Sequence, residues 1–82
     1  MTKEEQKLND AVDAFSNVMK ERLFQKCREG FKGWDDPELV PDFELECRML
    51  DKVHEEYVRN KVDIANFAMM LWYRKNMGLS VD

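Results

Sequence analysis

The sequence has few of the residues that cross-link a small domain through disulfide bonds or bound metal ions. Its two cysteines, Cys27 and Cys47, suggest neither a disulfide framework nor a zinc knuckle, so we expect reduced thiols. The single histidine, His54, supports no metal constellation. A chain of 82 residues is marginally stable alone and must rely on apolar packing. We expect the association of two or more copies to supply the additional stability.

A long apolar run and an excess of positive charge are also missing. The longest apolar-rich segment, residues 62–72, has eleven residues and includes Asp63 and Asn66, whereas a membrane span needs about 20. No apolar signal segment follows Met1. The net charge of −4 disfavours binding to a nucleic-acid backbone. We expect one soluble cytoplasmic domain over residues 1–82, with no membrane or nucleic-acid partner.

Glycine and proline are rare, and most of them lie together. Residues 42–77 contain neither, and residues 1–29 contain neither. These two segments are therefore the candidates for long helices, and the part between them is a Gly-Trp-Pro loop. The three glycines and two prolines are Gly30, Gly33, Pro37, Pro41 and Gly78.

The first segment has the pattern of one amphipathic helix. Thr2 and Glu5 have the spacing of a capping box, which marks a helix start. Apolar residues then recur at steps of three and four, which predicts a helix to about Glu29 that ends at Gly30. The apolar stripe comprises Leu8, Val12, Phe15, Met19 and Leu23.

The second segment predicts a single long helix over residues 42–77. Its apolar positions keep a mean spacing of about 3.6 residues, the period of an α-helix. Asp42 is suited to start the helix and Gly78 to end it. A hairpin at residues 54–60 is the alternative, although only Asn60 there favours a turn. The fold class is all-α.

A continuous helix of this length requires a second copy of the chain. It would extend about 52 Å at 1.5 Å per residue, whereas a compact chain of this size has a radius of gyration of about 12 Å. We expect a helical bundle completed in a homodimer or larger assembly. A two-fold axis near His54 would place Glu46 opposite Asp63 of the second copy. The predicted interface comprises Leu50, His54, Val58, Val62, Phe67, Met69 and Trp72.

Residues 63–70 read Asp-Ile-Ala-Asn-Phe-Ala-Met-Met. This octapeptide resembles the "DVANFAMM" signature of small, phage-borne MazG-like proteins. Phe15, Met19 and Leu23, then Lys32-Gly33-Trp34 and Glu46, match in order, so the resemblance covers about residues 15–75. It implies an all-α family of nucleoside triphosphate pyrophosphohydrolases that act as dimers or tetramers. A phage-encoded protein would act in the cytoplasm of the host cell.

The resemblance also implies Mg²⁺ as cofactor, held by an E-x-x-E pair and an E-x-x-D pair. Glu46 and Asp63 match one ligand in each pair and are the candidate metal ligands. Met49 and Asn60 occupy the other two positions, where a thioether and an amide are poor ligands for Mg²⁺. We therefore expect hydrolysis to be weak or lost, and no catalytic residue is assigned.

Four residues are candidates for binding the nucleotide itself. Trp34 could stack on a base and Lys32 could hold a phosphate; alternatively, Trp34 plugs the end of the bundle. Asn66, with Asp63, could contact a ligand, or the pair could form a buried polar network that fixes helix register. The predicted nucleotide-binding residues are Lys32, Trp34, Asn60 and Asn66.

Three hypotheses for function follow from these patterns. The first is a MazG-like protein that binds nucleotides with hydrolysis weak or lost. The second is an active Mg²⁺-dependent pyrophosphohydrolase whose site is completed across the dimer by Glu46, Asp63 and an acid such as Glu55 or Glu56. The third is a helical protein that inhibits a host protein and uses the scaffold only as a shape.

Overall fold

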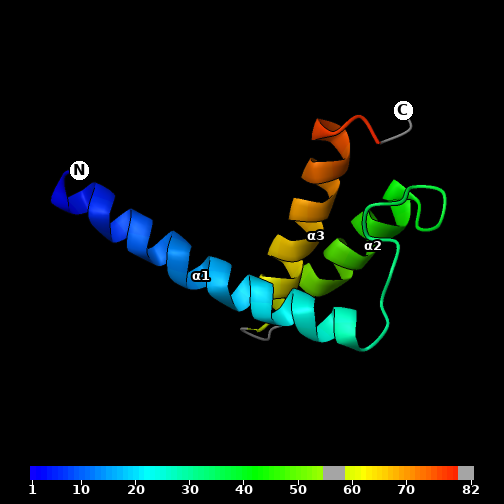
Figure 1. Ribbon diagram of the computed structural model, residues 1–82, viewed down its shortest axis with the longest axis horizontal. Helices are drawn as coiled ribbons and strands as arrows, with labels where there is room; N and C mark the ends of the chain where they lie inside the picture. Colours follow the sequence, from blue (N-terminus) through cyan, green and yellow to red (C-terminus); the bar gives the residue numbers. More distant parts are fainter. Residues whose placement is uncertain (55–58, 80–82) are drawn as a thin grey trace.

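The computed structural model describes residues 1–54 and 59–79, and its regular elements in these residues are all helices. Helix α1 spans Lys3–Arg28, α2 spans Asp42–Val53 and α3 spans Arg59–Asn76 (Figure 1). The predicted all-α class and the amphipathic N-terminal helix are thereby confirmed. No helix in the described residues is long and apolar enough to cross a membrane.

Helix α1 begins and ends where local sequence signals place it. The Thr2 hydroxyl accepts a hydrogen bond from Glu5 N at 3.1 Å, and the Glu5 carboxylate accepts one from Thr2 N at 3.0 Å. This is the predicted capping box. At the other end Gly30 has φ of +94°, a conformation that suits glycine and turns the chain out of the helix.

The capping box makes the stability of the α1 start depend on pH. The hydrogen bond from the Thr2 backbone, then that from its side chain, lowers the pKa of Glu5. Because the folded pKa lies below the unfolded one, this stabilisation is complete above the ordinary glutamate pKa and is lost as pH falls through the folded pKa. In an NMR titration, Thr2→Val should move the pKa of Glu5 only part of the way back toward its ordinary value, because valine keeps the backbone N–H that donates to Glu5 and removes the hydroxyl. An unchanged pKa would contradict the contribution of the side chain.

The prediction of one continuous helix over residues 42–77 is wrong. Helix α2 ends at Val53, His54 is its C-cap, and a separate helix begins at Arg59. The two helices pack side by side and antiparallel (Figure 1). This arrangement is a helical hairpin, which was the alternative prediction. The apolar spacing of 3.6 residues could not separate the two, because each helix of a hairpin has the same period as one long helix.

Helix α3 lies at the centre of the fold. It contacts both α1 and α2, whereas the described residues of α1 and α2 make no contact with each other. The C-terminal half of α1 crosses the hairpin, and its N-terminal half projects away from it (Figure 1). No residue of α1 is buried.

The core within one copy is small. Leu45, 2% exposed, is the only buried apolar residue in the described part of the chain. The other buried residues there are polar: Asn60, Asn66 and Arg74. So little apolar burial is unusual for an independently stable domain, since apolar burial is the main favourable term in folding.

Candidate functional site

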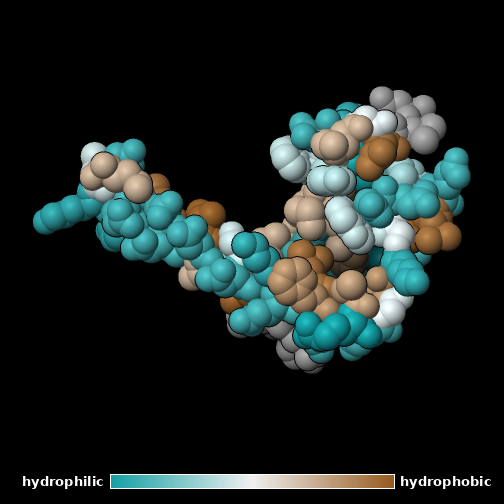
Figure 2. All heavy atoms as spheres, viewed as in Figure 1, coloured by the Kyte–Doolittle hydropathy of each residue, from teal (hydrophilic) through white to brown (hydrophobic). Residues whose placement is uncertain are grey.

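An open cavity of about 810 Å³ lies between α1 and α2. Helix α3 forms its floor because it contacts both walls, and the loop after α1 closes one end. Figure 2 shows apolar atoms gathered where α1 meets the hairpin. Pockets that bind small molecules usually have volumes of about 300–1,000 Å³, so the cavity has the size of a ligand site.

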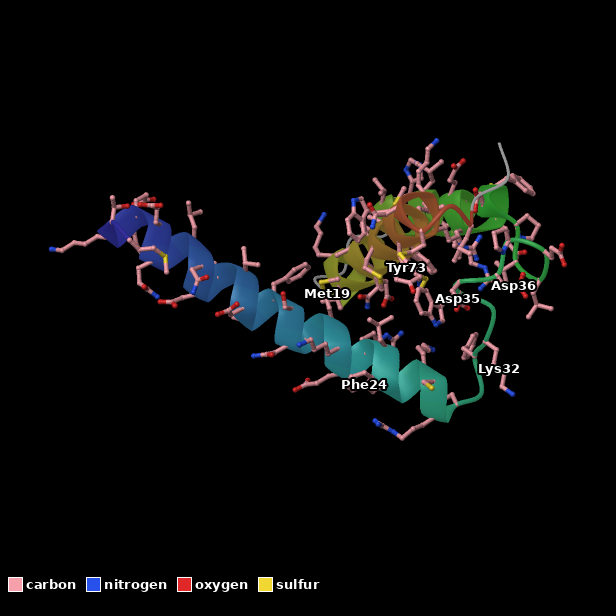
Figure 3. All side chains as sticks on the ribbon, turned by 45° about the horizontal axis from the view of Figure 1, so that its top comes forward. Met19, Phe24, Lys32, Asp35, Asp36 and Tyr73 are labelled. Atoms are coloured by element: carbon pink, nitrogen blue, oxygen red, sulfur yellow. The ribbon has the colours of Figure 1, made fainter. Side chains whose placement is uncertain are left out.

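The floor and the closed end of the cavity are mainly apolar. Phe67 and Met70 come from α3, Leu45 from α2 and Trp34 from the loop. The Trp34 ring packs against Tyr73, with centroids 5.1 Å apart and planes inclined by 55°. Figure 3 shows Tyr73 on α3 beside the loop residue Asp35. Trp34 is still 38% exposed, so the packed indole keeps surface that a ligand can contact.

The walls of the cavity are basic, in a chain whose net charge is −4. Several of these cations have exposed partners: Arg48 pairs with Glu44 at 2.6 Å, and Lys26 pairs with Glu29 at 3.4 Å. Exposed pairs contribute little and exchange readily for another anion. Five cations and three carboxylates line the cavity: Arg22, Lys26, Lys32, Arg48 and Lys52 against Asp35, Asp51 and Asp63.

Asp63 is held by an arginine of α1. The Nε of Arg22 donates to Oδ1 of Asp63 at 3.1 Å, and the Asp63 side chain is only 12% exposed. This ion pair joins α1 to the cavity floor. The carboxylate predicted to bind Mg²⁺ is therefore neutralised by a guanidinium of the same chain.

Of the two predicted metal ligands, Asp63 lines the cavity and Glu46 does not. Glu46 is exposed on α2 and does not line the cavity. Among the described residues, no three histidine, cysteine or acidic side chains gather as a metal site would require. The described residues thus form no cage of three or more such side chains, whereas Mg²⁺ is usually held by one or two carboxylates together with substrate phosphates. Glu55 and Glu56 lie outside the described residues.

The hypothesis that a second copy completes the metal site loses its geometric premise. It required one helix to carry Glu46 and Asp63 about 25 Å apart, but a hairpin places them on adjacent helices. In the hairpin, α2 and α3 pack against each other within one chain.

Three of the four predicted nucleotide-binding residues line the cavity: Lys32, Trp34 and Asn66. Asn60 does not; it is buried, with 2% exposed. Asn66 is also buried, with 4% exposed, and its Nδ2 donates to the Met19 carbonyl at 3.4 Å. Met19 lies where α1 passes α3 (Figure 3). The amide of Asn66 therefore sits at the junction between one wall and the floor.

The residues predicted to form a dimer interface are divided in the structure. Leu50 and Trp72 are 55% and 65% exposed, and His54 is exposed at the end of α2. Phe67 and Met69 are half-buried beside the cavity, and Val62 is half-buried. Val58 lies outside the described residues.

Arg74, which the sequence patterns did not single out, holds the loop in place. Its side chain is fully buried, and its Nη1 donates to the Val40 carbonyl at 2.7 Å and to Asp42 Oδ1 at 2.8 Å. Its Nε donates to the Trp34 carbonyl at 2.8 Å, and its Nη2 to the Gly33 carbonyl at 2.9 Å. All three guanidinium nitrogens thus hold the segment that carries Trp34. The signal in the sequence that could have identified Arg74 is its position close to the apolar residues 67–72, where a charged side chain needs a partner.

Gly33 permits the close approach of this loop. Its φ is +86°, and a Cβ at this position would lie 2.9 Å from the Leu39 side chain. The Lys32-Gly33-Trp34 element therefore requires glycine for both backbone conformation and space. Glycine in this element is explained by the fold, independently of any ligand.

No protein-family model, curated protein or solved structure matches this chain. The resemblance to phage MazG-like proteins consequently rests on the quoted residues alone. Of these, Asp63, Asn66, Phe67, Met69 and Met70 line the cavity, as do Lys32, Gly33 and Trp34.

Proposed function

We propose that this chain binds a nucleotide in the cavity above α3. The observation that carries the proposal is the lining: basic side chains on the walls over an apolar floor with an exposed indole. Phosphates need cations, and a base needs a flat apolar surface on which to stack. The excess of cations is local, so it would attract anions even though the whole chain is acidic.

We further propose that this protein binds nucleotides with little or no hydrolysis. Hydrolysis of a nucleotide usually depends on carboxylates that hold Mg²⁺ against the phosphates. Here Asp63 is paired with Arg22, and Glu46 lies outside the cavity lining. Any Mg²⁺ would arrive with the phosphates. An active pyrophosphohydrolase, the competing hypothesis, requires further acids besides Asp63 to hold the metal ion.

The working form in this proposal is a homodimer or larger assembly. The apolar stripe of α1 continues from its contact with α3 onto the projecting half, where Leu8, Val12 and Phe15 are 60%, 63% and 39% exposed. Figure 2 shows apolar atoms along this projecting part. The small core of one copy and this uncovered stripe both favour self-association.

Thermal stability measured against a panel of nucleotides tests the proposal. Nucleoside triphosphates and signalling nucleotides are added with and without Mg²⁺, and released pyrophosphate is assayed in the same wells. A ligand at 100 times its Kd stabilises the folded state by about 2.7 kcal/mol, which gives a clear rise in Tm. A rise without pyrophosphate supports a binder, and Mg²⁺-dependent pyrophosphate indicates the enzyme.

If no nucleotide in the panel raises the Tm, both the nucleotide-binding hypothesis and the pyrophosphohydrolase hypothesis are contradicted. The uncovered stripe of α1 would then favour the third hypothesis, a helical protein that binds a host protein. Co-purification from host cells would identify that partner, and substitution of the stripe should abolish the capture.

The two cysteines report where the ligand binds. Cys27 lines the cavity and Cys47 does not, although both are exposed. A saturating nucleotide should slow alkylation of Cys27 at least several-fold and leave Cys47 unchanged, because only the first thiol is covered. Mass spectrometry of the alkylated peptides measures both rates in one sample. Equal protection, or none, would place the ligand elsewhere.

A further inference from the structure

One hydrogen-bond acceptor beside the cavity has no partner among the described residues. Asn66 Oδ1 is buried and receives no hydrogen bond from any described residue. Buried polar atoms are nearly always paired, because leaving one unpaired costs free energy. This oxygen belongs to a residue that lines the cavity and is 4% exposed.

The orientation of the Asn66 amide is set by its surroundings. The Met19 carbonyl can only accept, so the group that faces it must be Nδ2, the donor. Rotating the amide by half a turn would place two acceptor oxygens against each other. The oxygen of Asn66 is therefore the atom left for another group, and that group must donate.

The charges around this oxygen indicate which part of a ligand reaches it. The basic side chains Lys26, Arg48 and Lys52 stand on the two helical walls, whereas Asn66 lies on the floor. Beside it, Asp63 on the floor and Arg22 of α1 neutralise each other. Phosphates would be held between the walls. The uncharged, flat part of the ligand would then lie on the floor, next to Asn66.

We propose that Asn66 Oδ1 selects nucleotides whose base carries an amino group at purine C6 or pyrimidine C4, as adenine and cytosine do. This inference rests on the proposed function, since it names the ligand class of the same cavity. The amino group donates to Asn66 Oδ1. Replacing it with a keto oxygen, as in hypoxanthine or uracil, places an acceptor against an acceptor and leaves both unpaired.

Two matched pairs of ligands test this selection. ATP and ITP differ at the purine amino position, and CTP and UTP differ at the corresponding pyrimidine position. Calorimetric titration of the full chain should give a Kd for the amino member at least about tenfold below that of the keto member in one pair or both, since 1.4 kcal/mol is a factor of ten.

The variant Asn66→Leu assigns the preference to this side chain. It keeps the size of the residue and removes the acceptor, so ATP and ITP, and likewise CTP and UTP, should bind it equally. A preference that persists in Asn66→Leu overturns the proposal. The comparison in the unmodified protein needs no variant and stands even where Asn66→Leu fails to fold.

The outcomes separate this inference from the proposed function. Equal binding of all four nucleotides to the unmodified protein overturns the selection by Asn66 and leaves nucleotide binding intact. If none of the four nucleotides binds, and no other nucleotide in the thermal panel binds either, both the selection by Asn66 and the proposed function are overturned.

Discussion

Replacing Arg74 with methionine should lower the free energy of unfolding by about 3–5 kcal/mol, the usual result of removing one partner from a buried ion pair. Methionine fills much of the same space but donates no hydrogen bond. Asp42 and three carbonyls, those of Gly33, Trp34 and Val40, would lose their donor together. Urea unfolding followed by circular dichroism measures the change.

Arg48→Met is the matched control for Arg74→Met. Arg48 also pairs with a carboxylate, that of Glu44, but its side chain is 48% exposed. Its loss should change the stability by less than about 1 kcal/mol, because water replaces the partner of an exposed charge. Similar losses in the two variants would show that the contacts of Arg74 do not hold the fold.

A second variant, Arg74→Lys, separates the charge of this residue from its geometry. A lysine at this position would keep the positive charge but could not direct donors to four oxygens at once, because an ammonium lacks the planar fork of a guanidinium. Arg74→Lys should therefore recover only part of the stability that Arg74→Met loses. A full recovery would mean that charge alone, rather than the geometry of the guanidinium, fixes the loop.

The double substitution Val12→Glu and Phe15→Glu should convert the proposed assembly to monomers. Burying a valine or phenylalanine side chain contributes about 1.5–3 kcal/mol, and an isologous interface contains each residue twice. Carboxylates at these positions would also repel their symmetry mates. The Kd of the dimer should rise more than about 100-fold, a change of about 2.7 kcal/mol. Sedimentation velocity over a range of protein concentrations measures it.

Asn17→Glu is the control for the double substitution. Asn17 is exposed on the same helix but lies on the side opposite the apolar stripe. It adds a carboxylate without touching the proposed interface, so association should persist. Dissociation in this variant as well, or a monomer at every concentration of the unmodified protein, would contradict the proposed assembly.

The elements that local signals define were predictable from the sequence. The capping box at Thr2 and Glu5 begins α1, and Gly30 follows its end. Each signal acts over a few residues, so the rest of the fold does not alter it. The break between α2 and α3 was predictable only as an alternative. The break depends on the contacts that α2 and α3 make with each other, which the apolar spacing does not specify.

The candidate site was predictable only in part. The resemblance selected Lys32, Trp34 and Asn66, which line the cavity, and also Glu46, which does not. The orientation of the Asn66 amide depends on its contact with Met19 of α1, which lies 47 residues earlier in the sequence. No local pattern records such a contact. For the same reason the patterns missed Arg74, whose partners lie 32 to 41 residues before it.

The central position of α3 sets the order in which the protein can be completed during synthesis. Helices α1 and α2 leave the ribosome first, but their described residues make no contact with each other. In the described part of the chain, nascent α1 therefore has no other helix to contact, and the loop lacks the guanidinium of Arg74, until α3 has been translated. Helices α1 and α2, which form the cavity walls, are thus synthesised before α3, the helix that contacts both of them. The cavity takes shape only when residues 63–74 have emerged.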